Sequence, residues 1–159
     1  AQLSYANNFK WAVSGGEDRY RRGLYTFFKR TSPHPNLITF DCPDSNVTCV
    51  KRNISNTPIA ALATLNNSVF TDAAKAMAKR LIKEQDSDSE RIAMGFQLCT
   101  ARKPSTREAA AFSAILKKAK LYYGENETEA KAFNGDAEAS AWATLTRIFL
   151  NLDEFITRE

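Results

Sequence analysis

The chain has 159 residues, of which 43% are hydrophobic, and a formal net charge of +4. A chain of this size and apolar content buries most of its apolar surface on folding, which excludes a disordered protein and predicts one domain over residues 1–159. The sequence has no apolar run of about 18 residues and no signal-peptide pattern at its start, so neither a membrane span nor a leader is predicted. It does not begin with Met, which indicates either a processed chain or a piece of a longer protein.

The positive charge is confined to the first third of the chain. Residues 1–56 carry eight Lys and Arg against four Asp and Glu, whereas residues 57–159 carry fourteen of each. A positive field favours anionic partners such as nucleic acid, acidic polysaccharide or an acidic protein face. The alternative is that Asp18, Asp41 and Asp44 neutralise part of this charge within the fold.

Residues 1–56 are predicted to be irregular, with one or two short strands. The stretch GLYTFFKR, residues 23–30, is rich in aromatic residues, and NVTCVKRN, residues 46–53, is rich in β-branched ones. Alternation along the first stretch gives it two largely apolar faces, which predicts a strand covered on both sides. Three prolines lie between the two stretches and predict an irregular loop of about fifteen residues.

From Thr57 onward the sequence predicts helices. Thr57 and Pro58 are typical of a helix start, and Thr71 is expected to cap a second helix with an apolar stripe from Ala74 to Ile82. Asp88 or Ser89 is expected to start a third helix, which ends before Pro104 because the residue preceding proline avoids the helical region.

Three more helices complete the predicted bundle. Ser105 and Glu108 form a capping-box pair for a fourth helix that ends at Gly124, and a short fifth follows from Asn126 to Gly135. The last helix is expected to run almost to the terminus, with one apolar face formed by Trp142, Leu145, Phe149, Leu152 and Ile156. The fold class is therefore mainly α: five or six packed helices over 57–159, preceded by the basic segment 1–56.

The best candidates for catalytic acids or bases are His34, Asp41 and Asp44. His34 is the single histidine, and it lies between two prolines. The alternative for both aspartates is turn formation beside Pro43 and Asn46. Two carboxylates and an amide at this spacing depart from the twelve-residue calcium loop, so no metal site is predicted.

Six cations are candidates for a ligand site, and nucleic acid is not the expected ligand. The stretch RGLYTFFK loosely resembles the aromatic strand of RNA-recognition domains, but a run of six helices does not fit that fold. The cations either converge on an acidic ligand or pair with Asp41 and Asp44 to fix the loop onto the helices, and we favour the pairing. They are Arg21, Arg22, Lys29, Arg30, Lys51 and Arg52.

Three cysteines leave the redox compartment open. Cys42 and Cys49 are seven positions apart in a loop-like segment and could form a disulfide, whereas Cys99 would remain as a small buried residue.

Three long stretches of the sequence resemble one known family. They are YRRGLYTFFKRTSPHPNLITFDCPD, NTPIAALATLNNSVFTDAAKAMAKRL and AWATLTRIFLNLDEFITRE, which lie in order from Tyr20 to the end of the chain. They are similar to the closing part of the planctomycete domain of unknown function 1553. The resemblance covers nearly the whole chain and about the back half of the family domain.

This resemblance implies a place at the end of large exported proteins, in the periplasm or at the cell surface. Such proteins commonly carry a cytochrome c-like heme domain upstream. The present sequence has no CxxCH heme-attachment motif, so any heme is expected in an upstream domain and no cofactor in this chain. Export makes the disulfide between Cys42 and Cys49 permissible.

The predicted function is that of a C-terminal structural or interaction domain in such a protein. Its expected partners are the upstream domains, with acidic polysaccharide or an acidic protein as further candidates. The alternative is an enzyme site completed by the missing upstream domains, acting on acidic polysaccharide through His34, Asp41 and Asp44.

Overall fold

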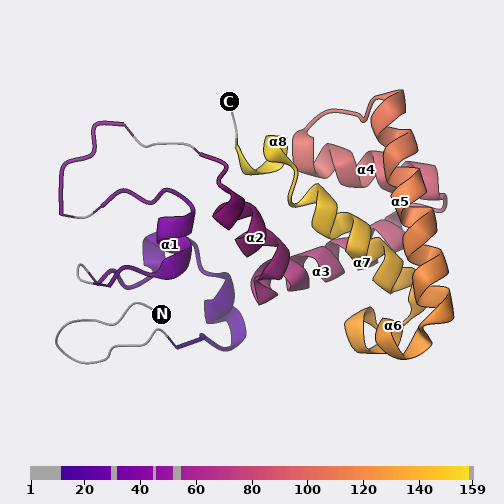
Figure 1. Cartoon of the computed structure of the whole chain (residues 1–159), viewed down its shortest axis with the longest axis horizontal. Coiled ribbons are helices and arrows are strands. Elements are labelled where there is room, and N and C mark those ends of the chain that lie inside the picture. The colour runs from indigo at the N-terminus through magenta and orange to yellow at the C-terminus, as the bar shows by residue number, and fades with distance from the viewer. Residues whose placement is uncertain (1–11, 30–31, 45, 52–54, 158–159) are drawn as a thin grey trace. The chain divides into compact units, whose positions relative to one another are not determined.

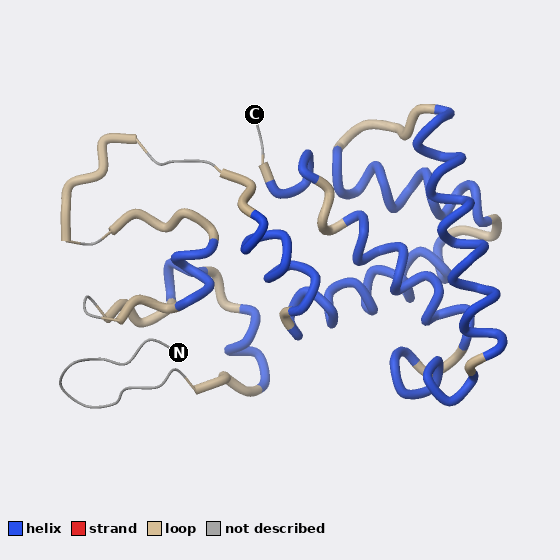
Figure 2. The backbone as a smooth tube through the Cα atoms, viewed as in Figure 1, coloured by secondary structure: helices blue, strands red, loops and turns tan. Residues whose placement is uncertain are grey.

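The computed structural model describes residues 12–29, 32–44, 46–51 and 55–157. Contacts between Cα atoms divide the chain into two compact units, Ala1–Ala63 and Thr64–Glu159, which we call the N-terminal unit and the helical unit. The prediction of one domain over 1–159 stays a prediction. Figure 2 shows helices joined by loops, with no strand among the described residues.

The N-terminal unit contains short helices and no strand in its described part, so the strand predictions are wrong there. Two 3₁₀ turns occupy Gly16–Tyr20 and Gly23–Tyr25, α1 spans Pro35–Thr39, and α2 starts near the end of the unit and spans Pro58–Asn66. Residues 46–51 form turns and bends, and positions 30, 52 and 53 lie outside the described residues.

Local hydrogen bonding explains why GLYTFFKR does not form the predicted strand. The backbone N–H of Tyr25 donates to the Arg22 carbonyl at 2.9 Å, and that of Thr26 donates to Gly23 at 3.1 Å. These bonds use donors that a strand would need for a neighbouring strand. The stretch is also not covered on both sides as predicted, since Leu24 is 83% and Phe27 68% exposed.

The helical unit confirms the bundle-like packing, with α7 at its centre. Figure 1 shows α7 lying between α3 and α5, and these two helices make its most extensive contacts. The described residues of the whole chain hold eight α-helices instead of the predicted five or six, because α1 and α8 add short ones. The helices of this unit are α3 Ser68–Glu84, α4 Asp88–Thr100, α5 Thr106–Glu125, α6 Glu127–Asn134, α7 Ala137–Phe149 and α8 Asp153–Ile156.

Two predicted helix starts are displaced by better caps. The side chain of Asn67 accepts from the Val69 N–H at 2.9 Å, so α3 begins three residues before the predicted cap Thr71. Ser87 caps α4 through a capping box with Glu90, one residue earlier than predicted. In both places a nearby polar side chain satisfies the first free N–H groups of the helix.

The start of α5 is confirmed, whereas the last predicted helix is broken. Ser105 and Glu108 form the expected capping box. After Phe149 the chain leaves the helix, and Leu152 takes an extended backbone before α8. The Asn151 side chain accepts a hydrogen bond from Thr64, which fixes the break against the start of the helical unit.

The core of the helical unit is built on aromatic side chains from three helices. Trp142 of α7 is fully buried, and the rings of Phe96, Phe112 and Phe149 form a cluster with centroids 5.0 to 6.3 Å apart. Gly95 allows this close approach, since a Cβ there would lie 2.8 Å from the Phe149 ring. The predicted apolar face of the last helix is confirmed for Trp142, Leu145 and Phe149, while Leu152 is half-buried.

Candidate functional site

His34 starts α1 in the N-terminal unit. Its Nδ1 accepts a hydrogen bond from the backbone N–H of Asn36 at 3.2 Å, and Pro35 takes the first helical position, as is typical of a helix start. Partial burial lowers the pKa of His34 below its usual value. Both observations favour a neutral imidazole whose Nδ1 is engaged with its own helix.

Asp41 ends the same helix. It has a left-handed backbone with φ of 54°, its N–H donates to the Ile38 carbonyl at 3.2 Å, and the next N–H, of Cys42, donates to Leu37 at 2.8 Å. This pair of bonds is a Schellman motif. The Asp41 carboxylate accepts from the backbone N–H and the hydroxyl of Ser55 at 2.8 and 2.7 Å, and so joins the end of α1 to residue 55.

Asp44 forms a local turn. Its Oδ1 accepts from both the backbone N–H and the side-chain amide of Asn46, at 2.9 and 2.8 Å. This is the turn chemistry that the sequence offered as the alternative to catalysis.

A hollow of about 700 Å³ brings some of the predicted site residues together within the N-terminal unit. Asp41, Asp44 and Lys51 line it, and His34 is not among its lining residues. The walls are otherwise mainly apolar, with Phe28, Pro33, Leu37, Ile38, Pro43, Val47 and Val50 among them. The three predicted acid or base candidates therefore do not share one wall.

The predicted cations are only partly brought together. Arg21 pairs with Asp18, three residues earlier, and both side chains are about 60% exposed. Arg22 donates to the Tyr25 hydroxyl at 3.2 Å and lies over its ring at 5.5 Å. Arg30 and Arg52 lie outside the described residues, and the pairing of the cations with Asp41 and Asp44 stays a prediction.

The segment with these arginines exposes aromatic and apolar groups as well. We call residues 19–27 the basic–aromatic segment. Arg19 lies over the Tyr20 ring at 5.9 Å, so the segment has two arginine–tyrosine contacts. Its most exposed large apolar side chain is Leu24.

Cys42 and Cys49 line the same hollow and are free thiols in this structure. Cys49 is exposed, and its thiol donates to the Lys51 carbonyl at 3.3 Å. The proposed disulfide stays a prediction. Cys99 is half-buried against the core, where burial raises the pKa of its thiol to about 11.

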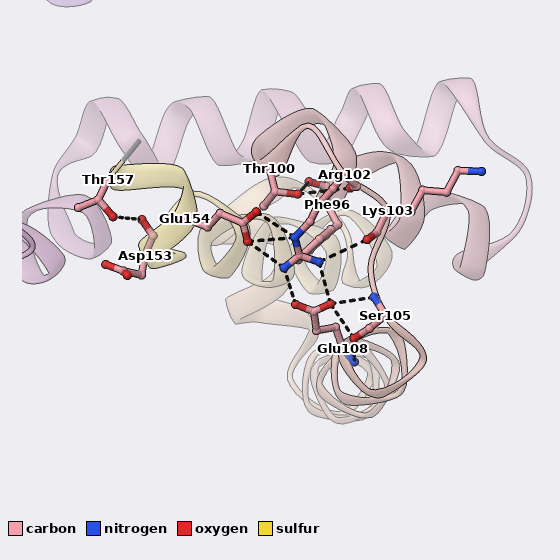
Figure 3. Close-up of polar contacts among 9 residues, drawn as sticks. All are labelled: Phe96, Thr100, Arg102, Lys103, Ser105, Glu108, Asp153, Glu154 and Thr157. Atoms are coloured by element: carbon pink, nitrogen blue, oxygen red, sulfur yellow. Dashed lines mark hydrogen bonds and ion pairs between the residues drawn. The ribbon is translucent and has the colours of Figure 1, made fainter. Parts of the chain in front are cut away.

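Arg102 is the most connected cation of the helical unit, as Figure 3 shows. Its guanidinium binds Glu108 through two hydrogen bonds of 2.8 and 3.0 Å, and binds Glu154 of α8 through both of that carboxylate's oxygens. It also lies 4.7 Å from the centre of the Phe96 ring. One side chain therefore joins the end of α4, the start of α5 and α8.

The contacts at Arg102 shift the pKa values of Arg102 and Glu108. Hydrogen bonds from Arg102, and then from Ser105, lower the pKa of Glu108 to about 2, and the two carboxylates raise the pKa of Arg102. All three charges are satisfied by one another at this site. The arrangement holds the end of α4, the start of α5 and α8 together.

Arg91 makes a second junction, closer to the core. Its Nε donates to the Gln85 carbonyl and its Nη1 to Glu138, both at 2.8 Å, while the guanidinium lies over the Trp142 ring at 5.8 Å. The side chain is only 11% exposed. The sequence analysis identified neither Arg91 nor Arg102. The predicted capping box was the one available signal, because it places the Glu108 carboxylate close to the loop that holds Arg102.

The described part of the chain offers no group of three or more metal-binding side chains. Within the same residues, no helix has both the length and the apolar character needed to cross a bilayer.

These observations define a mainly helical protein with a basic N-terminal unit. The sequence profile of a family described as "Protein of unknown function (DUF1553)", named PSD1, matches residues 2–116. The chain belongs to this family. No curated protein and no solved structure matches the chain.

The family match ends inside α5, but the folded unit does not. Helix α7, which is the most deeply buried, and α8 both follow residue 116. Arg102 lies within the matched part and binds Glu154 beyond it. The core of the helical unit therefore includes buried residues from Ala119 to Phe149, which follow the matched part.

Proposed function

We propose that the chain is a structural and interaction domain of a larger, exported multidomain protein. In this proposal the helical unit is a stable body, and the basic N-terminal unit makes contacts with a partner. The upstream domains of the same protein are the first candidate for that partner. Export and the multidomain context rest on the resemblance of the three sequence stretches.

One observation carries this proposal: the candidate acids and bases are engaged with nearby backbone. His34 accepts from Asn36, Asp41 from Ser55 and Asp44 from Asn46, each through a backbone N–H. Such bonds fix the local backbone around each side chain. Groups used in this way are suited to shaping a surface.

The hollow lined by Asp41 and Asp44 favours a second function, a hydrolase-like site for acidic polysaccharide. The two carboxylates would supply acid and base, Lys51 would contact an acidic sugar, and missing upstream domains would complete the site. The presence of two carboxylates at one hollow favours this second function. The hydrogen bonds of Asp41 to Ser55 and of Asp44 to Asn46 argue against it, because they already engage both carboxylates.

The cysteines of this chain do not match the spacing that attaches a c-type heme. Covalent attachment of a c-type heme uses two cysteines separated by two residues and followed by histidine. Here six residues separate Cys42 from Cys49, and His34 precedes both. We propose that any heme of the larger protein lies in an upstream domain.

Comparing the chain with and without its upstream neighbour tests the proposed function. We expect the free energy of unfolding of the chain to rise when the neighbour is attached, because a partner that binds only the folded state stabilises it. Denaturant unfolding followed by circular dichroism measures this. An unchanged free energy would contradict the proposal that the upstream domains are the partner.

An activity assay separates the second candidate from the first. The joined protein is incubated with polygalacturonate and with model glycosides, and the Asp41→Asn and Asp44→Asn variants serve as comparisons. The structural proposal expects no turnover that depends on either carboxylate. Turnover abolished by Asp41→Asn would establish the enzyme and overturn the structural role.

A further inference from the structure

We infer that the basic–aromatic segment, residues 19–27, is a docking surface for an acidic protein face with an apolar centre. This inference rests on the proposed interaction role and names the partner's chemistry and the residues that bind it. Four large side chains of the segment are mainly exposed: Tyr20 at 58%, Leu24 at 83%, Tyr25 at 59% and Phe27 at 68%.

The charge of the segment selects an acidic partner. It contains Arg19, Arg21 and Arg22 and no acidic residue. Asp18, just outside it, pairs with Arg21 in an exposed geometry that solvent screens strongly. A carboxylate on a partner can therefore replace Asp18 at little cost.

The arginine–tyrosine contacts prepare the segment for binding. Arg22 is held against Tyr25 by a hydrogen bond and by its position over the ring, and Arg19 lies over Tyr20. Side chains already held in place lose less conformational entropy on binding. Tyrosine and arginine are also the residue types that contribute most at protein interfaces.

The aliphatic side chain of Leu24 favours a protein over a polysaccharide or a membrane. A sugar ring packs on the flat face of an aromatic ring, but one face of Tyr25 is occupied by Arg22. A membrane-surface segment buries a continuous apolar face, whereas here Arg21 and Arg22 lie between the two short turns and separate Tyr20 from Leu24. A protein face with carboxylates around an apolar centre matches both the cations and Leu24.

The test measures binding of the whole chain to defined polymers at physiological salt. The probes are a random copolymer of glutamate and tyrosine, polyglutamate, polygalacturonate, and vesicles of anionic phosphatidylglycerol. We expect the copolymer to bind about tenfold more tightly than polyglutamate, because its tyrosines add apolar contact that outweighs its smaller number of carboxylates. We expect polygalacturonate and the vesicles to bind more weakly than the copolymer.

Three double variants locate the surface. Arg21→Glu with Arg22→Glu should weaken copolymer binding about tenfold or more, and Leu24→Ser with Phe27→Ser should remove the preference for the copolymer over polyglutamate. Lys117→Glu with Lys118→Glu changes the net charge equally on exposed positions of α5 and should leave binding nearly unchanged. Circular dichroism of each variant checks that the helical unit is intact.

Three results would overturn the inference. They are equal losses in the two charge-reversal variants, tightest binding to polygalacturonate or vesicles, and no binding to the copolymer. None of them affects the proposed function by itself, since stabilisation by the upstream neighbour is measured separately. If that stabilisation is absent while the copolymer binds as expected, the proposed partner within the same protein is wrong and the docking surface remains.

Discussion

The two units of the chain differ in what they do with their apolar residues. Of the sixteen buried apolar residues in the described parts, only Ala60 precedes residue 64, whereas ten of the thirteen large apolar residues that are exposed lie between Val13 and Leu62. Burial of apolar surface is the main favourable term in folding. The helical unit thus carries its own stability, and the N-terminal unit keeps apolar surface available for contact.

Two glycine substitutions test this difference most strongly. A Cβ at Gly95 would lie 2.8 Å from the Phe149 ring and 2.9 Å from Leu81, and a Cβ at Gly23 would lie 2.8 Å from the end of the Leu37 side chain. We expect Gly95→Ala to lower the free energy of unfolding by about 1–3 kcal/mol, since both neighbours are fully buried. Gly23→Ala should have a much smaller effect, because Leu37 is half-buried and can move. Urea unfolding of both variants measures the two effects. Equal losses in the free energy of unfolding would contradict the difference in packing between the two units.

The junction at Arg102 predicts how the helical unit responds to acid. The folded pKa of Glu108 is about 2, below the ordinary 4.5, so its contribution to stability is fully present above pH 4.5 and is lost as the pH falls towards 2. We expect the urea midpoint of the wild type to fall across this range. In the Glu108→Gln variant, the urea midpoint should fall less over the same pH range. The capping box should remain, because glutamine also forms it.

Arg102→Met provides a control for this pH effect. This variant removes the guanidinium and leaves Glu108 in place. If the guanidinium lowers the pKa of Glu108, the urea midpoint of the variant should also fall less with acid than that of the wild type. A slope as steep as that of the wild type in this variant would show that another group causes the acid sensitivity.

The reactivity of the cysteine thiols should also differ between the two units. Burial raises the pKa of the Cys99 thiol to about 11, so it stays protonated at neutral pH and should react slowly with a disulfide reagent. Cys49 is exposed and should react much faster. Timed labelling of Cys42→Ser and Cys99→Ser variants assigns the rates, and rapid labelling of Cys99 in the folded protein would contradict its burial.

The smallest expected effect belongs to Asp18. Its pair with Arg21 is mainly exposed, and exposed pairs contribute roughly 0–1 kcal/mol. Asp18→Asn should therefore leave the urea midpoint nearly unchanged. The same variant should strengthen binding of the glutamate–tyrosine copolymer, because it removes a competing carboxylate. A clear loss of stability would show that the pair fixes the fold of the N-terminal unit.

The sequence predicted the helices from Thr57 onward well because the signals that start a helix or set its buried face lie close together in the sequence. Each of these signals acts within one or two turns of helix. Examples are the capping pair Ser105 and Glu108, the helix start at Thr57 and Pro58, and the spacing of Trp142, Leu145 and Phe149. Errors arose where two polar residues competed as caps, as Asn67 did with Thr71. The break after Phe149 depends on a bond between Asn151 and Thr64, distant in sequence, which periodicity does not reveal.

The N-terminal unit was harder to predict because its residues suit several structures. The aromatic and β-branched residues of GLYTFFKR favour a strand, but no neighbouring strand exists among the described residues, and local turns form instead. Asp41 was identified as a possible acid, and its left-handed backbone at the end of α1 could not be expected from a residue other than glycine. The turn role of Asp44 was predictable from Asn46 two residues later.

The position of Arg102 also has an evolutionary consequence. Its two carboxylate partners are 6 and 52 residues away, one inside the family match and the other after it. Replacement of the arginine alone would leave two acidic groups facing each other without a counter-ion. Among relatives, we therefore expect positions 102, 108 and 154 to vary as a set, so that their covariation traces how far the true domain extends.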